Sequence, residues 1–383
     1  MEKKYQSIIE EVTKIRQQLH RFPELSYKEY KTTERIKATL KDWGISFTPF
    51  KNIETGGYAE VGSGPAVLYR ADIDALPIME DATNKYASEN TGVMHACGHD
   101  YHTAIGLGLL RYFQQFPEKL KGKLRVIFQP AEETTPTGAA LVIKEDIWDK
   151  AIAIFGIHVN SEDKIGEFSL SKTAANGSNT TVQINLTGPG GHTSRPDQSV
   201  DLILSGCEYV VLLHSYIKNK IDPRETVSFT FGQINGGHAK NAIPQSLELK
   251  GTLRTHSNEV LDRARNLIHV FSGPFAKLHD VNIAIDFPTS CPVAVNNTEL
   301  AEQFIDYYAQ NSREPLKILP KPSMGADDFA YYLERVPGLY VRVGGAGKGA
   351  AHTGGFVVDE RIIEPALRHM AGFITHYFKK SVL

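Results

Sequence analysis

Short apolar runs that alternate with helical patterns are the feature that most constrains how this chain can fold. The runs are rich in Val, Ile, Leu and aromatic residues and lie at residues 66–71, 123–128, 151–157, 226–232 and 338–343. Helical patterns at residues 103–113 and 138–144 separate the first three runs. Consecutive parallel strands need crossover connections, which are usually helices. The alternation therefore predicts an α/β fold with a mostly parallel sheet covered by helices on both faces.

The composition changes at residues 169–181 and again at residues 286–297, where small, polar and turn-forming residues gather as they do in linkers. Between these segments, patterns typical of strand, helix, two strands, helix and strand lie at residues 182–186, 200–218, 226–232, 247–254, 258–278 and 281–286. This order is that of a β-α-β-β-α-β domain. We therefore expect a discontinuous catalytic domain at residues 1–175 and 291–383, with an α+β domain at residues 176–290 inserted into it.

Charge and cysteine content narrow the class of protein. The 42 Lys and Arg residues nearly balance the 44 Asp and Glu residues, which argues against a nucleic-acid binder. The longest nearly apolar run, residues 151–159, is about half of what a membrane span needs. The N-terminal 22 residues have a helical pattern and no apolar stretch of the secretory kind. Three cysteines without a C-x-x-C pair fit a reducing compartment, so we expect a cytoplasmic protein without disulfides.

Polar segments gather where predicted strands end. They lie at residues 70–77, 94–104, 128–133, 156–159 and 351–355, and the second of them opens a predicted helix. In open α/β sheets, ligands bind outside the carboxyl ends of the strands. We therefore expect side chains from distant parts of the chain to meet in one cleft.

The side chains in these segments favour a metal site. A thiol, three imidazoles and a carboxylate are offered by Cys97, His99, Glu133, His158 and His352. This mixture suits Zn²⁺, Co²⁺, Ni²⁺ or Mn²⁺ and does not suit Ca²⁺ or Mg²⁺. Five ligands and a water fit two ions that share a ligand or two. Such a pair of ions, roughly 3.5–4 Å apart, activates a bridging water and polarises a substrate carbonyl.

Neighbouring carboxylates complete this hypothesis. Glu132, beside the predicted ligand Glu133, is a candidate general base. Asp72 or Asp74 is a candidate for orienting a ligand or the base. Taken singly, a histidine after a strand is usually structural and a lone cysteine is usually a small buried apolar residue. The motif C-G-H-D-x-H at residues 97–102 packs a thiol, two imidazoles and a carboxylate into six residues, and this density favours metal binding.

At these residues the sequence resembles the M20 metallopeptidases. The motifs MHACGHDYHT, FQPAEE and GGHTSRP carry the resemblance, which runs from about His20 to about Gly355. The sequence is most similar to the subfamily of hippurate hydrolase, N-acyl-amino-acid deacylases and N-acetyldiaminopimelate deacetylase. The resemblance implies a zinc-exopeptidase-like catalytic domain with two divalent metal ions. It also implies that the inserted domain is a lid, which often mediates dimerisation, so we expect a homodimer or a higher homo-oligomer.

The resemblance also implies roles for individual residues. The family's metal ligands match Cys97, His99, Glu133, His158 and His352. Its general base matches Glu132, and the acid after its first strand matches Asp72. In the wider family a metal-binding histidine stands two residues before that acid, where this chain has Arg70. Cys97 and His99 complete the set instead.

Residues of the lid extend the comparison. His192 resembles the histidine that reaches the tetrahedral intermediate, in dimeric members from the neighbouring subunit. Asn241 and Arg254 resemble groups that hold the carboxylate of the substrate. Asp328 stands where the subfamily often has Glu-Asp-Phe, and Asp-Asp-Phe here is a mild departure.

The leading hypothesis is a metal-dependent amidohydrolase that removes the acyl group from a small N-acyl amino acid. A metallo-dipeptidase or carboxypeptidase is an alternative with the same site. A second class is a thiol hydrolase with Cys97 as nucleophile and His99 or His102 as base. A third is a binding protein on a scaffold that has lost its activity, which the complete ligand set argues against.

Overall fold

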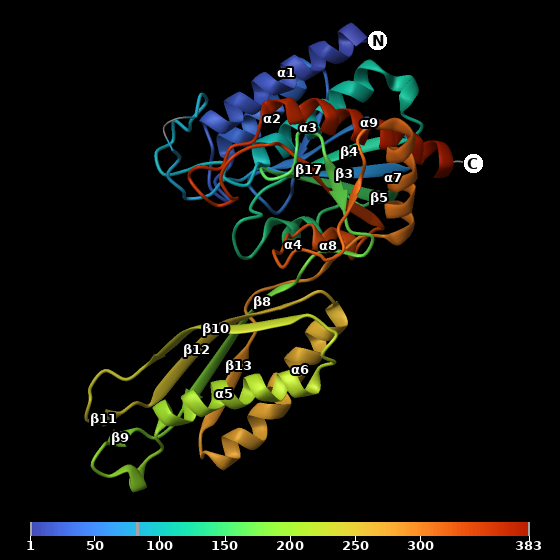
Figure 1. Cartoon of the computed structure of the whole chain (residues 1–383). Helices are drawn as coiled ribbons and strands as arrows, with labels where there is room; N and C mark the ends of the chain where they lie inside the picture. Colours follow the sequence, from blue (N-terminus) through green and yellow to red (C-terminus); the bar gives the residue numbers. More distant parts are fainter. Residues whose placement is uncertain (1, 82–83, 382–383) are drawn as a thin grey trace. The chain divides into compact units, whose positions relative to one another are not determined.

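The chain forms two compact units (Figure 1). The structure is a computed structural model, which describes residues 2–81 and 84–381 of the 383-residue chain. The first unit comprises Met1–Ala175, Val295–Lys321 and Asp328–Leu383, and the second comprises Asn176–Ala294 and Pro322–Asp327. We describe each unit by itself.

An eight-stranded sheet forms the centre of the first unit, in the order β1-β2-β4-β3-β5-β17-β6-β16. Its strands are β1 (Phe47–Pro49), β2 (Gly57–Gly62), β3 (Ala66–Asp72), β4 (Lys123–Gln129), β5 (Ala151–Asn160), β6 (Phe168–Leu170), β16 (Lys317–Ile318) and β17 (Gly338–Gly344). The four central strands, β4, β3, β5 and β17, are parallel to one another. The predicted α/β fold with a mostly parallel sheet is confirmed, and the carboxyl ends of these four strands meet at one edge.

Helices cover both faces of this sheet, as predicted (Figure 1). The larger core lies against α1 (Glu2–Arg21), α2 (Tyr30–Asp42), α3 (His99–Gln115), α7 (Thr298–Asn311) and α9 (Ile363–Ser381). The smaller core lies against α4 (Gly138–Val142) and α8 (Ala330–Leu333). In β3, Val67 and Tyr69 face the larger core and Leu68 faces the smaller one. Because both faces are covered, β3 is buried throughout and its sequence is a continuous apolar run rather than an alternating one.

The second unit has the predicted β-α-β-β-α-β order. Its main elements are β8 (Asn179–Thr187), α5 (Leu202–Lys220), β10 (Val227–Gly236), β12 (Ser246–Thr255), α6 (Asn258–Leu278) and β13 (Asn282–Asp286). These strands form an antiparallel sheet in the order β10-β12-β8-β13. Residues of β8 alternate between buried and partly exposed, and α5 and α6 pack on the buried face. The small strands β9 (Gly191–His192) and β11 (Ala242–Ile243) pair with each other.

The boundaries of the units differ from the expected domain limits in two places. The second unit continues to Ala294, and it also takes in Pro322–Asp327, which the sequence pattern assigned to the catalytic domain. The reason is backbone pairing: the N–H of Gly177 donates to the main-chain oxygen of Ser323 at 2.8 Å. The segments expected as linkers also contain short strands, β7 (Ala174–Asn176), β14 (Ser290–Cys291) and β15 (Ala294–Val295). Composition does not disclose such pairs, because backbone groups make them.

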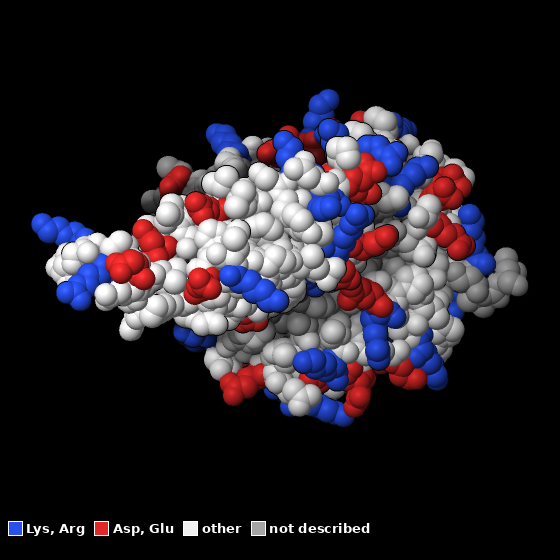
Figure 2. Space-filling view, turned by 90° about the horizontal axis from the view of Figure 1, so that it is seen from below, with Lys and Arg blue, Asp and Glu red and all other residues white. Residues whose placement is uncertain are grey.

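Two surface properties bear on the function classes considered above. Lys and Arg side chains are interspersed with Asp and Glu side chains on the face shown in Figure 2. Within residues 2–81 and 84–381, no helix has both the length and the apolar character that crossing a membrane requires.

Candidate metal centre

The five predicted ligands come from separate elements of the first unit. Cys97 and His99 flank Gly98, the N-cap residue of α3, and His158 lies near the carboxyl end of β5. Glu133 lies in the loop after β4, and His352 lies in the loop after β17. The parallel arrangement of β4, β5 and β17 explains the convergence, since all three strands deliver their following residues to one edge of the sheet.

Gly98 allows the start of α3 to approach β5 closely. Its φ of +87° lies in the left-handed region, which side chains rarely adopt. A Cβ atom at this position would lie 2.2 Å from Cγ2 of Val159. Only glycine therefore lets Cys97 and His99 stand beside the end of β5, where His158 is located.

The ligand atoms lie close enough to share metal ions. The sulfur of Cys97 is 3.5 Å from Nε2 of His158. Oε1 of Glu133 is 3.2 Å from Nε2 of His352 and 3.8 Å from Nε2 of His99. The structure thus brings together all five of the side chains that the sequence nominated as ligands.

This donor set fits divalent metal ions. Oε1 of Glu133 is buried and faces the imidazoles of His99 and His352 without a well-directed hydrogen bond within the described residues, although a buried carboxylate oxygen ordinarily has one. Sulfur, nitrogen and oxygen donors together match zinc and its neighbours in the first transition row. The geometry and the chemistry of the donors are those of a metal site.

The electrostatics of the cluster also favour a metal site. Burial raises the pKa of the Cys97 thiol, and the carboxylate of Glu133 raises the pKa of the His352 imidazole. A buried thiol with a raised pKa is a poor nucleophile by itself, whereas coordination to a metal ion deprotonates it. This disfavours Cys97 as the nucleophile of a metal-independent thiol hydrolase.

Asp74 holds two of the predicted ligands in place. Its Oδ1 lies 3.2 Å from Nδ1 of His99, whose ring also contacts the main-chain oxygen of Asp74 at 2.9 Å. Its Oδ2 accepts hydrogen bonds from the main-chain N–H of Glu133 at 3.0 Å and from the hydroxyl of Ser26 at 2.6 Å. A carboxylate on the far nitrogen of a ligating histidine fixes the ring and increases its basicity. Of the two aspartates considered for orienting a ligand, Asp74 makes the direct contacts to His99 and Glu133.

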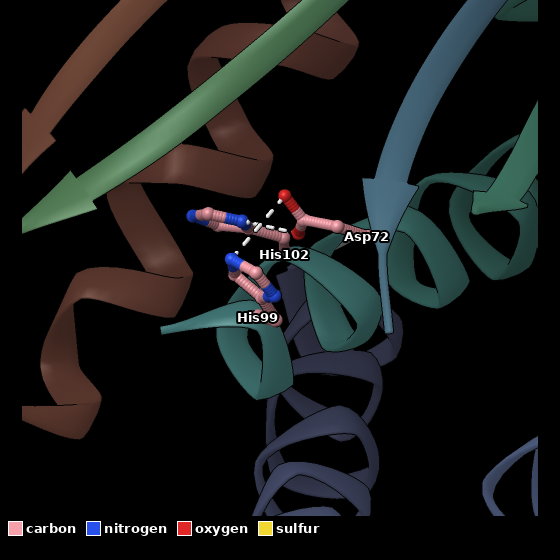
Figure 3. Close-up of side chains that lie close together, drawn as sticks. All are labelled: Asp72, His99 and His102. Carbon is pink, nitrogen blue, oxygen red and sulfur yellow. Dashed lines mark hydrogen bonds and ion pairs between the residues drawn. The ribbon is translucent and has the colours of Figure 1, made fainter. Parts of the chain in front are cut away.

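Asp72, at the end of β3, points toward α3 (Figure 3). Its Oδ1 accepts a hydrogen bond from Nδ1 of His102 at 2.6 Å, and its Oδ2 pairs with the guanidinium of Arg70 and lies 3.5 Å from Nε2 of His99. Although burial alone would raise the pKa of Asp72, Arg70 and the two histidines hold it well below its usual value. Arg70, at the position of the wider family's histidine ligand, thus forms an ion pair with Asp72.

His102 links this aspartate to β5. Its Nε2 accepts the main-chain N–H of Val159 at 3.0 Å, so the ring proton resides on Nδ1 and is donated to Asp72. Sequence reasoning considered His102 only as the base of a thiol hydrolase. The geometry instead shows that His102 holds the backbone of Val159, the residue after His158, in place. Its place in the C-G-H-D-x-H motif was the available signal, since it lies one helical turn after His99.

Glu132 lies beside the metal ligands and is half-buried. Ligand atoms of His99, Glu132 and Glu133 all lie within 4.8 Å of one another. Asp328, in contrast, is fully enclosed: it accepts hydrogen bonds from Arg70 at 2.6 Å and from Gln129 at 2.8 Å. These hydrogen bonds tie Asp328 to β3 and to the end of β4, after which the loop that carries Glu132 and Glu133 begins.

The three predicted lid residues belong to the second unit. His192 is exposed in β9, and its Nδ1 accepts the main-chain N–H of Ser194 at 3.1 Å. Asn241 is its neighbour, since β9 pairs with β11 and the N–H of Thr193 donates to the main-chain oxygen of Asn241. Arg254 lies near the end of β12 and donates to the main-chain oxygen of Met324 at 2.9 Å.

An α/β sheet whose carboxyl edge gathers sulfur, nitrogen and oxygen donors around a carboxylate defines a class of metal-dependent hydrolases. The sequence profile of peptidase family M20/M25/M40 matches residues 68–376, and the chain belongs to this family. Its relatives are hydrolases, and the protein is a metal-dependent amidohydrolase.

Individual relatives agree with this assignment. N-acetyl-L-cysteine deacetylase of Bacillus subtilis is 34% identical over 352 residues, which cover 91% of this chain and 84% of the relative. N-acetyldiaminopimelate deacetylase of Priestia megaterium is 32% identical over 374 residues, covering 96% and 98% of the two chains. A solved Bacillus subtilis structure, described as a dinuclear metal-binding peptidase of the M20 family, matches with a TM-score of 0.85. It is 28% identical, and the match covers 98% of this chain and 99% of that one.

Proposed function

We propose that this protein removes the acyl group from small N-acyl amino acids, using two divalent metal ions held by Cys97, His99, Glu133, His158 and His352. The observation that carries the proposal is the convergence of these five donors beside Glu132. Two relatives named as deacetylases of N-acetyl amino acids support the choice of substrate class. The mixture of donors suits Mn²⁺, Zn²⁺, Co²⁺ or Ni²⁺.

The residues of the chain divide the work of amide hydrolysis. When bound, the ions would supply Lewis-acid polarisation of the amide carbonyl and a lowered pKa for the attacking water. The carboxylate of Glu132 accepts the proton of that water and returns it to the nitrogen of the leaving amine. His192 donates a hydrogen bond to the carbonyl oxygen as that oxygen gains negative charge. Asp74 holds the ring of His99 and the backbone of Glu133 in place while this happens.

The geometry of the lid supports an active homodimer. Asn241 and His192 lie next to the start of β12, whereas Arg254 lies near its end. Eight residues of extended strand separate these ends by roughly 27 Å. One lid therefore cannot bring His192 and Arg254 to the same small substrate, but the lids of two subunits can.

Two further features fit a homodimer and a cytoplasmic location. The helix α5 exposes Leu204, Val211 and Leu212, an apolar surface that a second copy of the chain would cover. The three cysteines are free thiols, which fits an enzyme of the cytoplasm.

The variant Glu132→Gln tests the assignment of the base. We expect kcat to fall by about 10²–10⁴-fold, because the amide cannot accept the proton of the water. Metal content, measured by elemental analysis, should stay at the wild-type value, since the five ligands are untouched. A near-normal kcat would contradict the proposal.

A panel of N-acetyl amino acids, N-benzoyl amino acids and dipeptides identifies the substrate class in the same experiment. Preferential hydrolysis of the acyl amino acids supports a deacylase, and preferential hydrolysis of the dipeptides would make the protein a dipeptidase instead.

A chelator distinguishes the metal mechanism from the thiol mechanism. Activity that survives a chelator but is lost to iodoacetamide would support the thiol mechanism. Loss to the chelator with recovery on adding Mn²⁺, Co²⁺ or Zn²⁺ supports the metal mechanism.

A further inference from the structure

The connection between α1 and α2 contacts the loop that carries Glu132 and Glu133. This connection contains the segment Ser26–Glu29, which lies about a hundred residues earlier in the chain than the loop at residues 130–138. Neither a metal ligand nor a base was assigned to it. Its contacts to the loop are nevertheless specific and polar.

Glu29 makes the most unusual of these contacts. It is fully buried, with 0% of its surface exposed. One carboxylate oxygen accepts the main-chain N–H groups of Ala131 at 2.9 Å and Tyr27 at 3.0 Å, and the other accepts the hydroxyl of Thr55 at 2.7 Å. Within residues 2–81 and 84–381, no Lys, Arg or His side chain forms an ion pair with Glu29. Burying a carboxyl group without a cation is costly, so a compensating role is expected.

The N–H that Glu29 accepts belongs to a strained residue. Ala131 has a φ of +57°, in the left-handed region that costs a residue with a side chain about 1–2 kcal/mol. Its main-chain oxygen accepts the N–H of Gly138 at 2.7 Å, which closes the loop. Ala131 immediately precedes Glu132, so the direction in which the Glu132 side chain points depends on this backbone conformation.

Two neighbours of Glu29 are linked to the same loop, Tyr27 directly and Ser26 through Asp74. The hydroxyl of Tyr27 donates to the main-chain oxygen of Pro136 at 2.6 Å. The hydroxyl of Ser26 donates to Asp74, and the same oxygen of Asp74 accepts the N–H of Glu133. The segment therefore contacts the loop directly at Ala131 and Pro136, and through Asp74 at Glu133.

We propose that Glu29 is a positioning residue, which holds Ala131 in its left-handed conformation and thereby aims the carboxylate of Glu132 at the reacting water. The inference rests on the proposed function only for the role of Glu132. The contact between Glu29 and the loop is independent of the reaction, so it can be measured separately.

Substitutions at Glu29 test this role. In Glu29→Ala, we expect kcat to fall roughly 10- to 100-fold with little change in KM, because the base is misaimed while the substrate site is intact. Glu29→Gln should keep most of the activity. Its amide oxygen can accept both N–H groups, and the Thr55 hydroxyl can accept from its NH₂ group. Burial, reinforced by Asp74, raises the pKa of Glu29 to about 7.

A rescue experiment separates positioning from general stability. Glycine adopts a positive φ without strain, so adding Ala131→Gly to Glu29→Ala should restore kcat several-fold. Hydrogen exchange of the peptide covering residues 129–139 should be faster in Glu29→Ala than in the wild type and slower again in the double variant. Glu145→Ala is the matched control. Glu145 is 5% exposed and accepts the N–H groups of Lys51 at 2.8 Å and Asn52 at 3.0 Å, away from Glu132.

The outcomes decide between the possibilities. Unchanged exchange at residues 129–139 in Glu29→Ala overturns the proposal, and so does a loss of kcat in Glu29→Gln as large as that in Glu29→Ala. If Glu145→Ala loses as much kcat as Glu29→Ala, the effect is one of general stability, and this result also overturns the proposal. If the wild-type protein hydrolyses no acyl amino acid, the proposed function fails, while the exchange measurements still decide whether Glu29 holds the loop.

Discussion

At the scale of single residues, buried charge is concentrated next to the metal centre. His20 of α1 lies between Asp100 at 2.8 Å and Glu80 at 3.0 Å, and Arg16 also pairs with Asp100 at 3.0 Å. Asp100 follows the predicted ligand His99 directly in α3. The network thus anchors the first turn of the helix that carries this ligand.

The pH dependence of stability should report on this network. Burial alone would lower the pKa of His20, but the carboxylates of Asp100 and Glu80 raise it to about 9. Because this folded-state pKa lies above the ordinary 6.5, the stabilisation is fully present below pH 6.5 and is lost as the pH rises through 9. We expect the free energy of unfolding of the metal-free protein to fall by on the order of 1–3 kcal/mol across this window. Urea titrations at a series of pH values measure it.

The variant His20→Gln provides the comparison, since it cannot gain or lose a proton in this window. Its unfolding free energy should change less between pH 6.5 and pH 9 than that of the wild type. Equal slopes for the two proteins would contradict the assignment of the effect to His20.

Individual site residues differed in how far the sequence could identify them. Cys97 and His99 stand in a dense motif whose chemistry has few other uses, whereas His158 and His352 were nominated by their places after strands; all of these donors converge with Glu133. Asp72 and Asp74 could not be told apart, because which carboxylate reaches which ring depends on how the chain turns after β3. Glu29 gave no local signal, since its partner Ala131 is distant in sequence and offers only a backbone group.

At the scale of elements, the close approach of α3 to β5 places two of the predicted ligands. We expect Gly98→Ala to destabilise the protein by about 1–3 kcal/mol, because the new methyl group would overlap Val159. Cys97 and His99 would then be displaced, so metal affinity should fall as well. Thermal unfolding and competition with a chelator measure the two effects.

Gly92→Ala is the matched control. Gly92 has a similar φ of +80°, but a Cβ atom there would meet nothing within 4 Å. An alanine at this position has the same backbone strain as one at Gly98 but no steric overlap. If both variants lower the metal affinity equally, the contact with Val159 is not the cause.

Elements with strong apolar patterns were predicted nearly at their observed bounds. The predicted strand at residues 66–71 is β3, and the predicted helix at residues 258–278 is α6. The strand β5 continues three residues beyond its apolar run, because it pairs with β17 as far as Asn160. The helix α2 was not predicted, since Ile36 and Leu40 are its only buried apolar residues. Tertiary pairing and packing decide such cases, and a local pattern does not contain them.

At the scale of the whole molecule, the proposed dimer can be tested by mixing two inactive variants. Glu132→Gln removes the base from the catalytic unit, and His192→Ala removes the imidazole from the lid. If the lid of one subunit serves the other, a mixed dimer holds one complete site. After subunit exchange at equal concentrations, about a quarter of all sites should be complete. Steady-state hydrolysis of an N-acyl amino acid measures the recovery.

Each variant alone, treated in the same way, is the control for this experiment. If the activity of the mixture is no higher than the sum of the activities of the separate variants, the lid of one subunit does not contribute His192 to the active site of the other. This result would leave His192 to act within its own chain.

The order of the strands also governs when the centre can be completed. In the sheet, β5 and β17 are neighbours, yet the entire second unit separates them in the sequence. During synthesis from the N-terminus, Cys97, His99, Glu133 and His158 emerge before this unit, and His352 emerges after it. A nascent chain therefore exposes four donors before the fifth exists, and such long-range pairing is slow to form. The complete set of five donors therefore exists only after β17 has paired with β5.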